Sequence, residues 1–463
     1  MSKIDFDNLN TKQRYAVETM LEGKNVFLTG DAGTGKTTVI QTFIDEAEKR
    51  GKSVLVTATT GIAADNIGYG ATTVHRALDI SIEFEKYKEK VKSRVPLLKE
   101  TDVLIIDEIS MCRFDLFNMI AKTIFLENEE RARERLFGDG TKEDIQLIVT
   151  GDFYQLPPVT TSNDRDILAR MYGTEFCKGG AKEYGYAFMS EYWKDMGFDY
   201  INLDEVCRQS DADFKYVLND IKYGKNIRKA INYLEGKQAS KVIPEAPFLV
   251  GTNAKADQIN NNFMSKLNPE TEQIFHAYSE GDLDASDIKN INFAKEHLTL
   301  NIGAKVMITV NDQEGRYVNG TMGIITDIYE ADFDEEPYLK ITTDKGKEIK
   351  LYRYSKDIEK QVIKEEKDKD GNIKEKIVRE KVGSFCQFPV KLAWAISIHK
   401  SQGQTFEKLN IDPACWDPGQ FYVAVSRAKT ASGIHFIVPI KQSYIKAFSK
   451  ENEKMLRDSF EME

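Results

Sequence analysis

The stretch NVFLTGDAGTGKTTVI, from Asn25 to Ile40, determines the architecture expected of this chain. A short apolar run ends in a glycine-rich segment, and a helical pattern follows from Val39 to Arg50. The pattern G-x-x-x-x-G-K-[ST] between a strand and a helix predicts a phosphate-binding loop, because glycines let successive backbone N–H groups surround an anion. A helix N-terminus adds partial positive charge at the same place. The predicted loop consists of Gly30, Asp31, Ala32, Gly33, Thr34, Gly35, Lys36, Thr37 and Thr38.

This loop and the later strand VLIIDEIS together predict a metal-dependent nucleotide site. Lys36 is expected to reach the β- and γ-phosphates, and the Thr37 hydroxyl is expected to bind Mg²⁺. Asp107 ends the apolar strand and is expected to hold the same ion through water, while Glu108 orients and deprotonates an attacking water. Two adjacent carboxylates favour hydrolysis over transfer to a hydroxyl substrate. Taken alone, each motif has a simpler explanation, a glycine-rich turn or a solvated strand end.

Three further polar residues complete the candidate catalytic set. Gln155 follows a predicted strand in QLIVTGDFYQLPPV, where a polar side chain can sense the γ-phosphate, although an ordinary turn explains the segment equally well. Arg208 in EVCRQ and Arg427 in YVAVSRA are candidates to stabilise charge on the transferring phosphoryl group, an effect of roughly 10³ to 10⁵ in rate. A structural ion pair is the alternative for each arginine.

Outward from the loop, the first two hundred residues alternate short apolar runs with helical patterns. The runs NVFLTG, SVLVTAT, VLIIDE, QLIVTGD and YINLDE predict buried parallel strands of a doubly wound α/β domain, which places ligands at their carboxyl ends. We assign residues 1–204 to this first domain and treat the charged segment at about 77–98 as an insertion.

A second α/β domain with an inserted β-module is predicted for the remainder. PFLVGT, LNID and GIHFIVP predict its strands, and we assign it residues 205–302 and 384–463. Residues 303–383 contain KVMITV, GIITDIYE, YLKITT and KEIKLYRY between Gly and Asp turns, the pattern of a small antiparallel barrel. A charged hairpin is expected at about 360–381.

Composition narrows the class of protein. The chain has 463 residues, 64 Lys and Arg against 74 Asp and Glu, and a formal net charge of −10, which argues against coating nucleic acid through bulk positive charge. The five cysteines show no zinc-ligand spacing, so free thiols in a reducing compartment are expected. With no signal-peptide core and no apolar stretch of membrane length, a cytoplasmic chain is expected, associated with the nucleoid in a bacterial or phage-infected cell.

The ordered motifs resemble a known family. LNTKQ, GDAGTGKTT, TATTGIAA, DEISM, GDFYQLPPV, EVCRQ, KLAWAISIHKSQGQTF and YVAVSRA are similar to the helicase motifs of superfamily one, and closest to its RecD-like, PIF-type DNA helicases. The matches run from Leu9 to Lys429. The resemblance implies two RecA-like P-loop domains, a small wedge insertion in the first, and a Src-homology-like β-barrel in the second. It also implies ATP and Mg²⁺ as cofactors and 5′→3′ travel on single-stranded DNA.

Further site residues follow from this resemblance alone. It implies that Gln13 reads the adenine edge, that Gly403 lines the nucleotide cleft, and that Arg208 and Arg427 are arginine fingers. Within the insertion, Phe84, Tyr87 and Val95 become candidates to meet a duplex junction, although a solvated amphipathic loop explains them as well. The residues that would face the nucleic acid strand are Thr60, His75, His399, Ser401 and Thr405.

Several alternatives stay open at this level. A related motor acting on RNA or travelling 3′→5′ has the same motifs, and a regulatory P-loop NTPase or a nucleotide kinase shares the first loop. The expected partners are single-stranded DNA and forked or tailed duplexes, with a G-quadruplex or an RNA–DNA hybrid as further substrates, because stacking and phosphate contacts tolerate any base. A monomer in the free state and no membrane partner are expected.

Overall fold

In the computed structural model, the chain divides into two compact units. The first unit contains residues 2–207, 359–380 and 448–463, and the second contains residues 208–358 and 381–447. The structure describes residues 6–80, 95–205, 211–281 and 295–460, together with residues 283, 288, 291 and 293. The positions left out within these ranges are 139, 181, 313, 315, 318, 331–335, 345 and 368–372.

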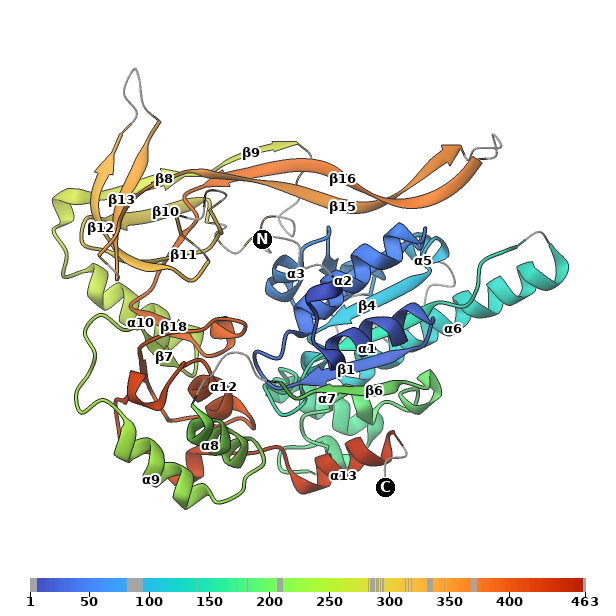
Figure 1. Ribbon diagram of the computed structural model, residues 1–463, viewed down its shortest axis with the longest axis horizontal. Helices are drawn as coiled ribbons and strands as arrows, with labels where there is room; N and C mark the ends of the chain where they lie inside the picture. The colour runs from blue at the N-terminus through green and yellow to red at the C-terminus, as the bar shows by residue number, and fades with distance from the viewer. Residues whose placement is uncertain are drawn as a thin grey trace. The chain divides into compact units, whose positions relative to one another are not determined.

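A six-stranded parallel sheet with the order β3-β2-β4-β5-β1-β6 forms the centre of the first unit (Figure 1). Its strands are β1 (Val26–Gly30), β2 (Val54–Ala58), β3 (Thr72–Thr73), β4 (Val103–Asp107), β5 (Gln146–Thr150) and β6 (Asp199–Leu203). All five predicted strands are present, and the short β3 is added at one edge. Because β1, β2 and β5 are buried along their whole length, their sequences are continuous apolar runs rather than alternating ones.

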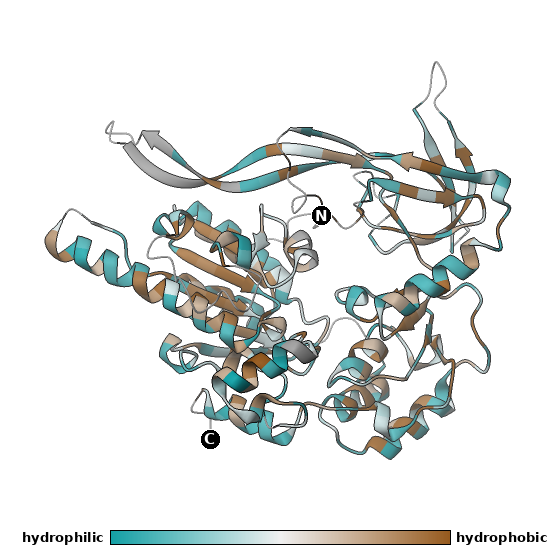
Figure 2. Cartoon of the chain, turned by 180° about the vertical axis from the view of Figure 1, so that it is seen from behind, coloured by the Kyte–Doolittle hydropathy of each residue, from teal (hydrophilic) through white to brown (hydrophobic). Residues whose placement is uncertain are grey.

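Helices cover this sheet and bury two apolar clusters against it. One cluster includes Phe27, Phe117 and Trp193, and the other includes Val17 and Ile40. Figure 2 shows the hydrophobic strands between helices whose outer faces are hydrophilic. The helices of this unit are α1 (Thr11–Leu21), α2 (Lys36–Lys49), α3 (Gly61–Ile67), α4 (Val74–Ala77), α5 (Pro96–Lys99), α6 (Phe114–Phe137), α7 (Ser162–Tyr172) and α13 (Lys450–Asp458).

A four-stranded parallel sheet with the order β18-β7-β19-β20 forms the α/β part of the second unit. Three of its strands were predicted, β7 (Phe248–Val250), β19 (Leu409–Ile411) and β20 (Ile434–Phe436). The fourth strand, β18 (Ala395–Ser397), lies inside the motif KLAWAISIHK and was not predicted. The helices of this unit are α8 (Ala212–Lys222), α9 (Ile227–Lys237), α10 (Asn253–Met264) and α12 (Gln420–Ser426).

The predicted β-module contains a five-stranded antiparallel sheet with the order β14-β13-β12-β11-β17. Its strands are β11 (Lys305–Ile308), β12 (Met322–Tyr329), β13 (Tyr338–Thr343), β14 (Glu348–Tyr352) and β17 (Val390–Leu392), and β8 (Glu272–His276) pairs with β10 (His297–Asn301). Because β17, β8 and β10 lie outside residues 303–383, strands from both flanks contribute to the module.

The predicted hairpin is longer than expected. Its strands are β15 (Tyr354–Lys367) and β16 (Ile373–Gln387), which form a sheet with β9 (Tyr278–Gly281), and the connection at 368–372 lies outside the described residues. Residues 359–380 group with the first unit, where the Arg379 guanidinium pairs with Glu48 and lies 4.9 Å from the centre of the Tyr69 ring. The hairpin was expected to belong entirely to the inserted β-module.

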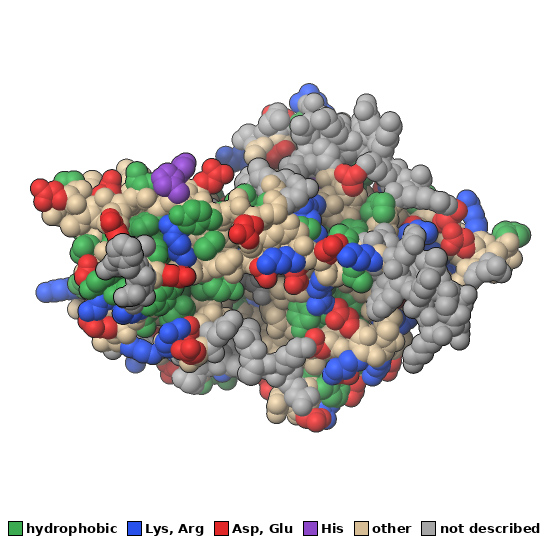
Figure 3. Space-filling view, turned by 90° about the horizontal axis from the view of Figure 1, so that it is seen from above, with side chains coloured by type: hydrophobic (Ala, Val, Ile, Leu, Met, Phe, Trp, Pro, Cys, Tyr) green, Lys and Arg blue, Asp and Glu red, His purple; other side chains and the backbone are tan. Residues whose placement is uncertain are grey.

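Two other expectations differ from the structure. The second domain was expected to extend to residue 463, but Phe448 and Leu456 are buried in a core cluster of the first unit. Val95 is 4% exposed and packs in the same cluster, so it is not available to meet a duplex, and Phe84 and Tyr87 lie outside the described residues. On the face in Figure 3, the described Lys and Arg side chains are interspersed with Asp and Glu, in keeping with the net negative charge.

Candidate nucleotide site and nucleic-acid interface

The loop between β1 and α2 has the geometry of a phosphate cradle. Gly33 and Gly35 have φ angles of 88° and 86°, a left-handed conformation that glycine adopts without strain. Gly35 is the N-cap of α2 and supplies no side-chain cap, so the first N–H groups of the helix are available to an anion. A Cβ atom at Gly35 would lie 2.6 Å from Nε2 of Gln13, and the left-handed φ would strain any residue with a side chain at this position.

Lys36 and Gln13 both contact this loop. The Lys36 ammonium donates to the carbonyl oxygens of Gly30 at 2.8 Å and Asp31 at 3.3 Å. Gln13 donates through Nε2 to the Thr34 carbonyl at 3.0 Å, and a capping box with Asn10 fixes its position at the start of α1. The structure therefore brings Gln13, which the family resemblance placed at the nucleotide, into contact with the predicted loop.

Two carboxylates follow each other at the end of β4, and the first of them, Asp107, interacts electrostatically with Lys36 of the phosphate loop. Burial, and then the adjacent Glu108 carboxylate, raises the pKa of Asp107 above its usual range, whereas the charge of Lys36 lowers it. Glu108 has a φ of 54°, which is uncommon for a residue with a side chain, and its carbonyl accepts from the Thr59 hydroxyl at 2.9 Å. Strained backbone and a perturbed carboxyl at a strand end are typical of functional sites.

These donors fit Mg²⁺. Hard oxygen ligands suit this ion, and a cation between Asp107 and the exposed Thr37 hydroxyl would relieve the repulsion that raises the Asp107 pKa. When bound, Mg²⁺ would neutralise charge on the β- and γ-phosphates. No group of three or more His, Cys, Asp or Glu side chains gathers as a metal cluster within the described part of the chain.

Gln155 lies in a short loop that follows β5. Its backbone N–H donates to the Asp152 carbonyl at 2.9 Å, and its Nε2 donates to the Asp152 carboxylate at 3.2 Å. The backbone N–H of Tyr154 donates to the other oxygen of that carboxylate at 3.1 Å. Asp152, which is 1% exposed, thus organises the loop and holds the Gln155 amide.

In the second unit, the structure engages the Arg427 guanidinium internally. It donates to the carbonyls of Val423 at 3.0 Å and Ser401 at 3.5 Å and to the Ser426 hydroxyl at 3.0 Å, and the residue is 1% exposed. Arg427 therefore lies at the end of α12 in contact with its own unit. Arg208 lies outside the described residues.

The residues expected to face nucleic acid differ in their exposure to solvent. Ser401 is fully buried and its hydroxyl donates to the Ile398 carbonyl at 2.8 Å, so its placement does not support the expected phosphate contact. Thr405 is exposed, and so is Gly403, which was expected to line the nucleotide cleft. Thr60 is half-buried and caps α3 by accepting from the Ala63 N–H at 3.2 Å.

The two histidines of this set are partly buried. Burial is the main cause that lowers the pKa of His75 and of His399 below the usual range, while Asp115 and Asp417, respectively, oppose it. Both imidazoles are therefore neutral near pH 7 and can donate or accept one hydrogen bond. They suit a neutral polar contact better than a charge contact to phosphate.

Two further polar residues were not singled out from the sequence. Nε2 of Gln402 and Oε1 of Gln404 are buried and find no hydrogen-bond partner among the described residues. They flank Gly403 in HKSQGQTF, where orphaned buried polar atoms are costly unless a ligand or water satisfies them. Their position in the motif HKSQGQTF was the feature of the sequence that could have identified them as candidate site residues.

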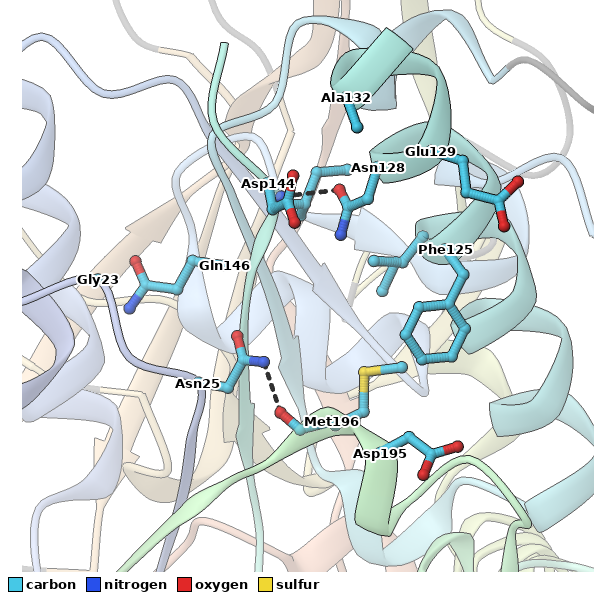
Figure 4. A pocket seen from close by; sticks show the side chains of 12 residues that line it. Gly23, Asn25, Phe125, Asn128, Glu129, Ala132, Asp144, Gln146, Asp195 and Met196 are labelled. Atoms are coloured by element: carbon cyan, nitrogen blue, oxygen red, sulfur yellow. Dashed lines mark hydrogen bonds between the residues drawn. The ribbon is translucent and has the colours of Figure 1, made fainter. Parts of the chain in front are cut away.

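A pocket of about 580 Å³ lies at the amino ends of β1 and β5 (Figure 4), whereas the phosphate loop follows the carboxyl end of β1. Residues that precede β1 and β5 line it, among them Asn25, whose amide donates to the Met196 carbonyl at 2.6 Å. Parallel sheets bind ligands at their carboxyl ends, so this pocket is separate from the nucleotide site. Among the helices described, none has the length and apolar character that a membrane crossing requires.

The chain is similar to known proteins over most of its length. The profile of the PIF1-like helicase family matches residues 8–231. The chain is 32% identical to the ATP-dependent DNA helicase Pif1 of Bdellovibrio bacteriovorus, over 93% of this chain and 88% of the relative.

Solved structures extend the likeness over both units. The Bacteroides sp. Pif1 complex with ADP-AlF4 is 31% identical, covers 97% of each chain and superposes with a TM-score of 0.77. The Bacteroides Pif1 structure bound to single-stranded DNA is 30% identical, covers 98% of this chain and 97% of the other, and has a TM-score of 0.61. The two RecA-like domains predicted from the sequence are thereby confirmed.

Proposed function

Because this chain belongs to the PIF1-like helicase family, we propose that it is an ATP-dependent DNA helicase that moves 5′→3′ along single-stranded DNA and unwinds duplex DNA. The observation that carries the proposal is the nucleotide site, in which Lys36 follows the uncapped N-terminus of α2 and interacts electrostatically with Asp107, next to Glu108. A relative bound to ADP-AlF4 supports ATP as the nucleotide, and a relative bound to single-stranded DNA supports the track.

The roles of individual residues follow from their chemistry. Lys36 and the helix N–H groups would hold the phosphates, Thr37 and Asp107 would bind Mg²⁺, and Glu108 would accept the proton of the attacking water. Gln155 would sense the γ-phosphate from its loop. ATP binding would favour a closed arrangement of the two RecA-like domains and hydrolysis an open one, so that the differential affinity of the two states for ATP drives movement.

The arginines Arg208 and Arg427 would supply charge from the second domain. Thr60, His75, His399 and Thr405 would contact the sugar–phosphate strand, which positions the protein without reading the base sequence. Forked and tailed duplexes are the proposed substrates, and a monomer is the proposed free state. G-quadruplexes and RNA–DNA hybrids are compatible with the same contacts.

Two measurements test this function. ATP hydrolysis is measured with single-stranded DNA, with RNA and without nucleic acid, and unwinding is measured on duplexes with a 5′ or a 3′ tail. We expect stimulation by DNA and unwinding from the 5′ tail; unwinding only from the 3′ tail would refute the direction, and an absence of any nucleic-acid stimulation would favour a regulatory NTPase.

A matched pair of lysine variants tests the site itself. Lys36→Ala should abolish DNA-stimulated hydrolysis with an unchanged fold. Lys49→Ala removes an exposed lysine from the same helix, where it pairs with the Glu46 carboxylate, and should retain activity. Undiminished turnover in Lys36→Ala would show that the assignment of the site is wrong.

A further inference from the structure

The end of the chain crosses from the second unit back to the first. The second unit ends at Ala447, and residues 448–460, which we call the C-terminal strap, belong to the first unit. The strap contains α13, which Figure 1 marks near the C-terminus. Phe448 and Leu456 are each 6% exposed and lie in the same buried cluster as Phe27 and Trp193. A surface tail would not bury these side chains, so the strap is an integral part of the first unit.

Two aromatic rings anchor the strap at its two ends. At the C-terminal end, the Phe460 ring stacks on Phe27 with 5.6 Å between ring centres and lies 5.2 Å from Tyr200. At the N-terminal end, the Phe448 ring lies 4.9 Å from Tyr154 and 5.2 Å from Tyr186. Pairs at these separations stabilise a contact beyond the area that they bury.

The Phe448 anchor differs from the Phe460 anchor in what it contacts. Tyr154 lies between Asp152 and Gln155, and its backbone N–H donates to the same Asp152 carboxylate that accepts from the Gln155 amide. Phe448 therefore packs against the loop that carries the proposed γ-phosphate sensor. The described ring contacts of Phe460 are with Phe27, Trp193 and Tyr200, none of which belongs to that loop.

Just before the strap begins, the chain forms a hydrogen bond to the start of α12, the helix of the second unit that ends at Arg427. The carbonyl of Lys446 accepts from the backbone N–H of Gly419 at 2.8 Å. Gly419 is the N-cap of α12, and Arg427 is the C-cap of the same helix. The Cα atoms of Lys446 and Phe448 can be at most roughly 7 Å apart, because each residue spans no more than about 3.6 Å. The covalent link between these two attachments therefore has little slack.

We propose that Phe448 is a positioning residue that couples the α12 helix of the second unit to the Gln155 loop of the first unit. The proposal rests on the proposed function, in which Arg427 and Gln155 act on the γ-phosphate from different domains. When domain closure moves α12, the short link would transmit that movement through the Phe448 ring to Tyr154 and so to the Asp152 and Gln155 pair. The strap would thus synchronise the arginine finger with the sensor.

The test compares Phe448→Ala with Phe460→Ala, because both remove an aromatic anchor from the strap. We expect Phe448→Ala to lower kcat of DNA-stimulated ATP hydrolysis by roughly threefold to tenfold, the worth of one or two aromatic contacts, with KM for ATP changed less than about twofold. Phe460→Ala should lower the unfolding temperature but leave kcat unchanged. An equal loss of kcat in both variants, or no loss in Phe448→Ala, would overturn the proposal.

A double-variant cycle shows whether the effect passes through Tyr154. If it does, adding Phe448→Ala to Tyr154→Ala should lower kcat no further, whereas additive losses would refute the route. Should Phe448→Ala not fold, Phe448→Leu and Phe460→Leu, which keep most of the side-chain volume, are compared by the same criteria. Hydrolysis by the unaltered chain is measured first, so that a failure of the proposed function is distinguished from a failure of the strap.

Discussion

Arg131 provides the sharpest prediction about stability. It lies on α6, is 2% exposed, and donates to the carbonyls of Leu98 at 2.6 Å, Thr101 at 2.8 Å and Glu143 at 2.7 Å, as well as to the Glu127 carboxylate at 3.3 Å. Arg131→Met keeps the apolar part of the side chain but leaves the buried Glu127 carboxylate and several carbonyl oxygens without their hydrogen-bond donor. Removing one partner of a buried ion pair costs about 3 to 5 kcal/mol.

This free energy predicts a measurable change in unfolding. For a unit of this size, each kcal/mol shifts the unfolding temperature by about 2 to 4 °C, so a loss of roughly 6 to 20 °C is expected for the transition of the first unit. Differential scanning calorimetry measures it, with Arg133→Met as the control, because Arg133 lies on the same helix with 68% of its side chain exposed. Adding Glu127→Gln should recover part of the loss. A shift below about 2 °C in Arg131→Met would refute the reasoning.

Two other predictions concern Arg427 and His75. Arg427→Ala should keep ATP binding, measured with a fluorescent nucleotide, and lose hydrolysis; a variant that fails to bind ATP would show that the residue is not a finger. Burial lowers the pKa of His75, so the folded state binds fewer protons than the unfolded state below about pH 6.5, and stability should fall as the pH falls through that value. His75→Asn should show a shallower fall in unfolding temperature between about pH 7.5 and 5.5, and an equal slope would contradict the assignment.

The sequence predicted the parts of the fold that are written as local patterns. Fully buried parallel strands are continuous apolar runs, which is why the five main strands of the first sheet were found. β18 was missed because it has three residues inside a motif that carries chemistry. The C-terminal strap was predicted to belong to the second domain, but it packs in the first unit. The prediction was wrong because the anchors of the strap are single aromatic residues in a polar segment. No periodicity specifies which core such residues enter.

The same limit applies to the candidate site. Spacing identified the loop and the carboxylates, because backbone geometry and metal chemistry require particular residues close together in sequence. It could not show that Ser401 is buried, since a hydroxyl in HKSQGQTF suits a phosphate contact and a backbone contact equally well. Nor could it show that Gln402 and Gln404 leave polar atoms without partners. These properties depend on how distant segments pack.

The contacts of Arg427 bear on its proposed role as an arginine finger. Its guanidinium is bound to two carbonyls and a hydroxyl of its own unit, and all three acceptors are neutral. A phosphate oxygen carries negative charge and forms shorter and roughly twice as strong a hydrogen bond to the same donor. For the proposed finger role of Arg427, exchange of these neutral acceptors for the γ-phosphate would be favourable once the nucleotide is within reach. Until then, the contacts within its own unit satisfy the buried guanidinium, so the proposed finger role would make hydrolysis depend on the nucleotide reaching Arg427.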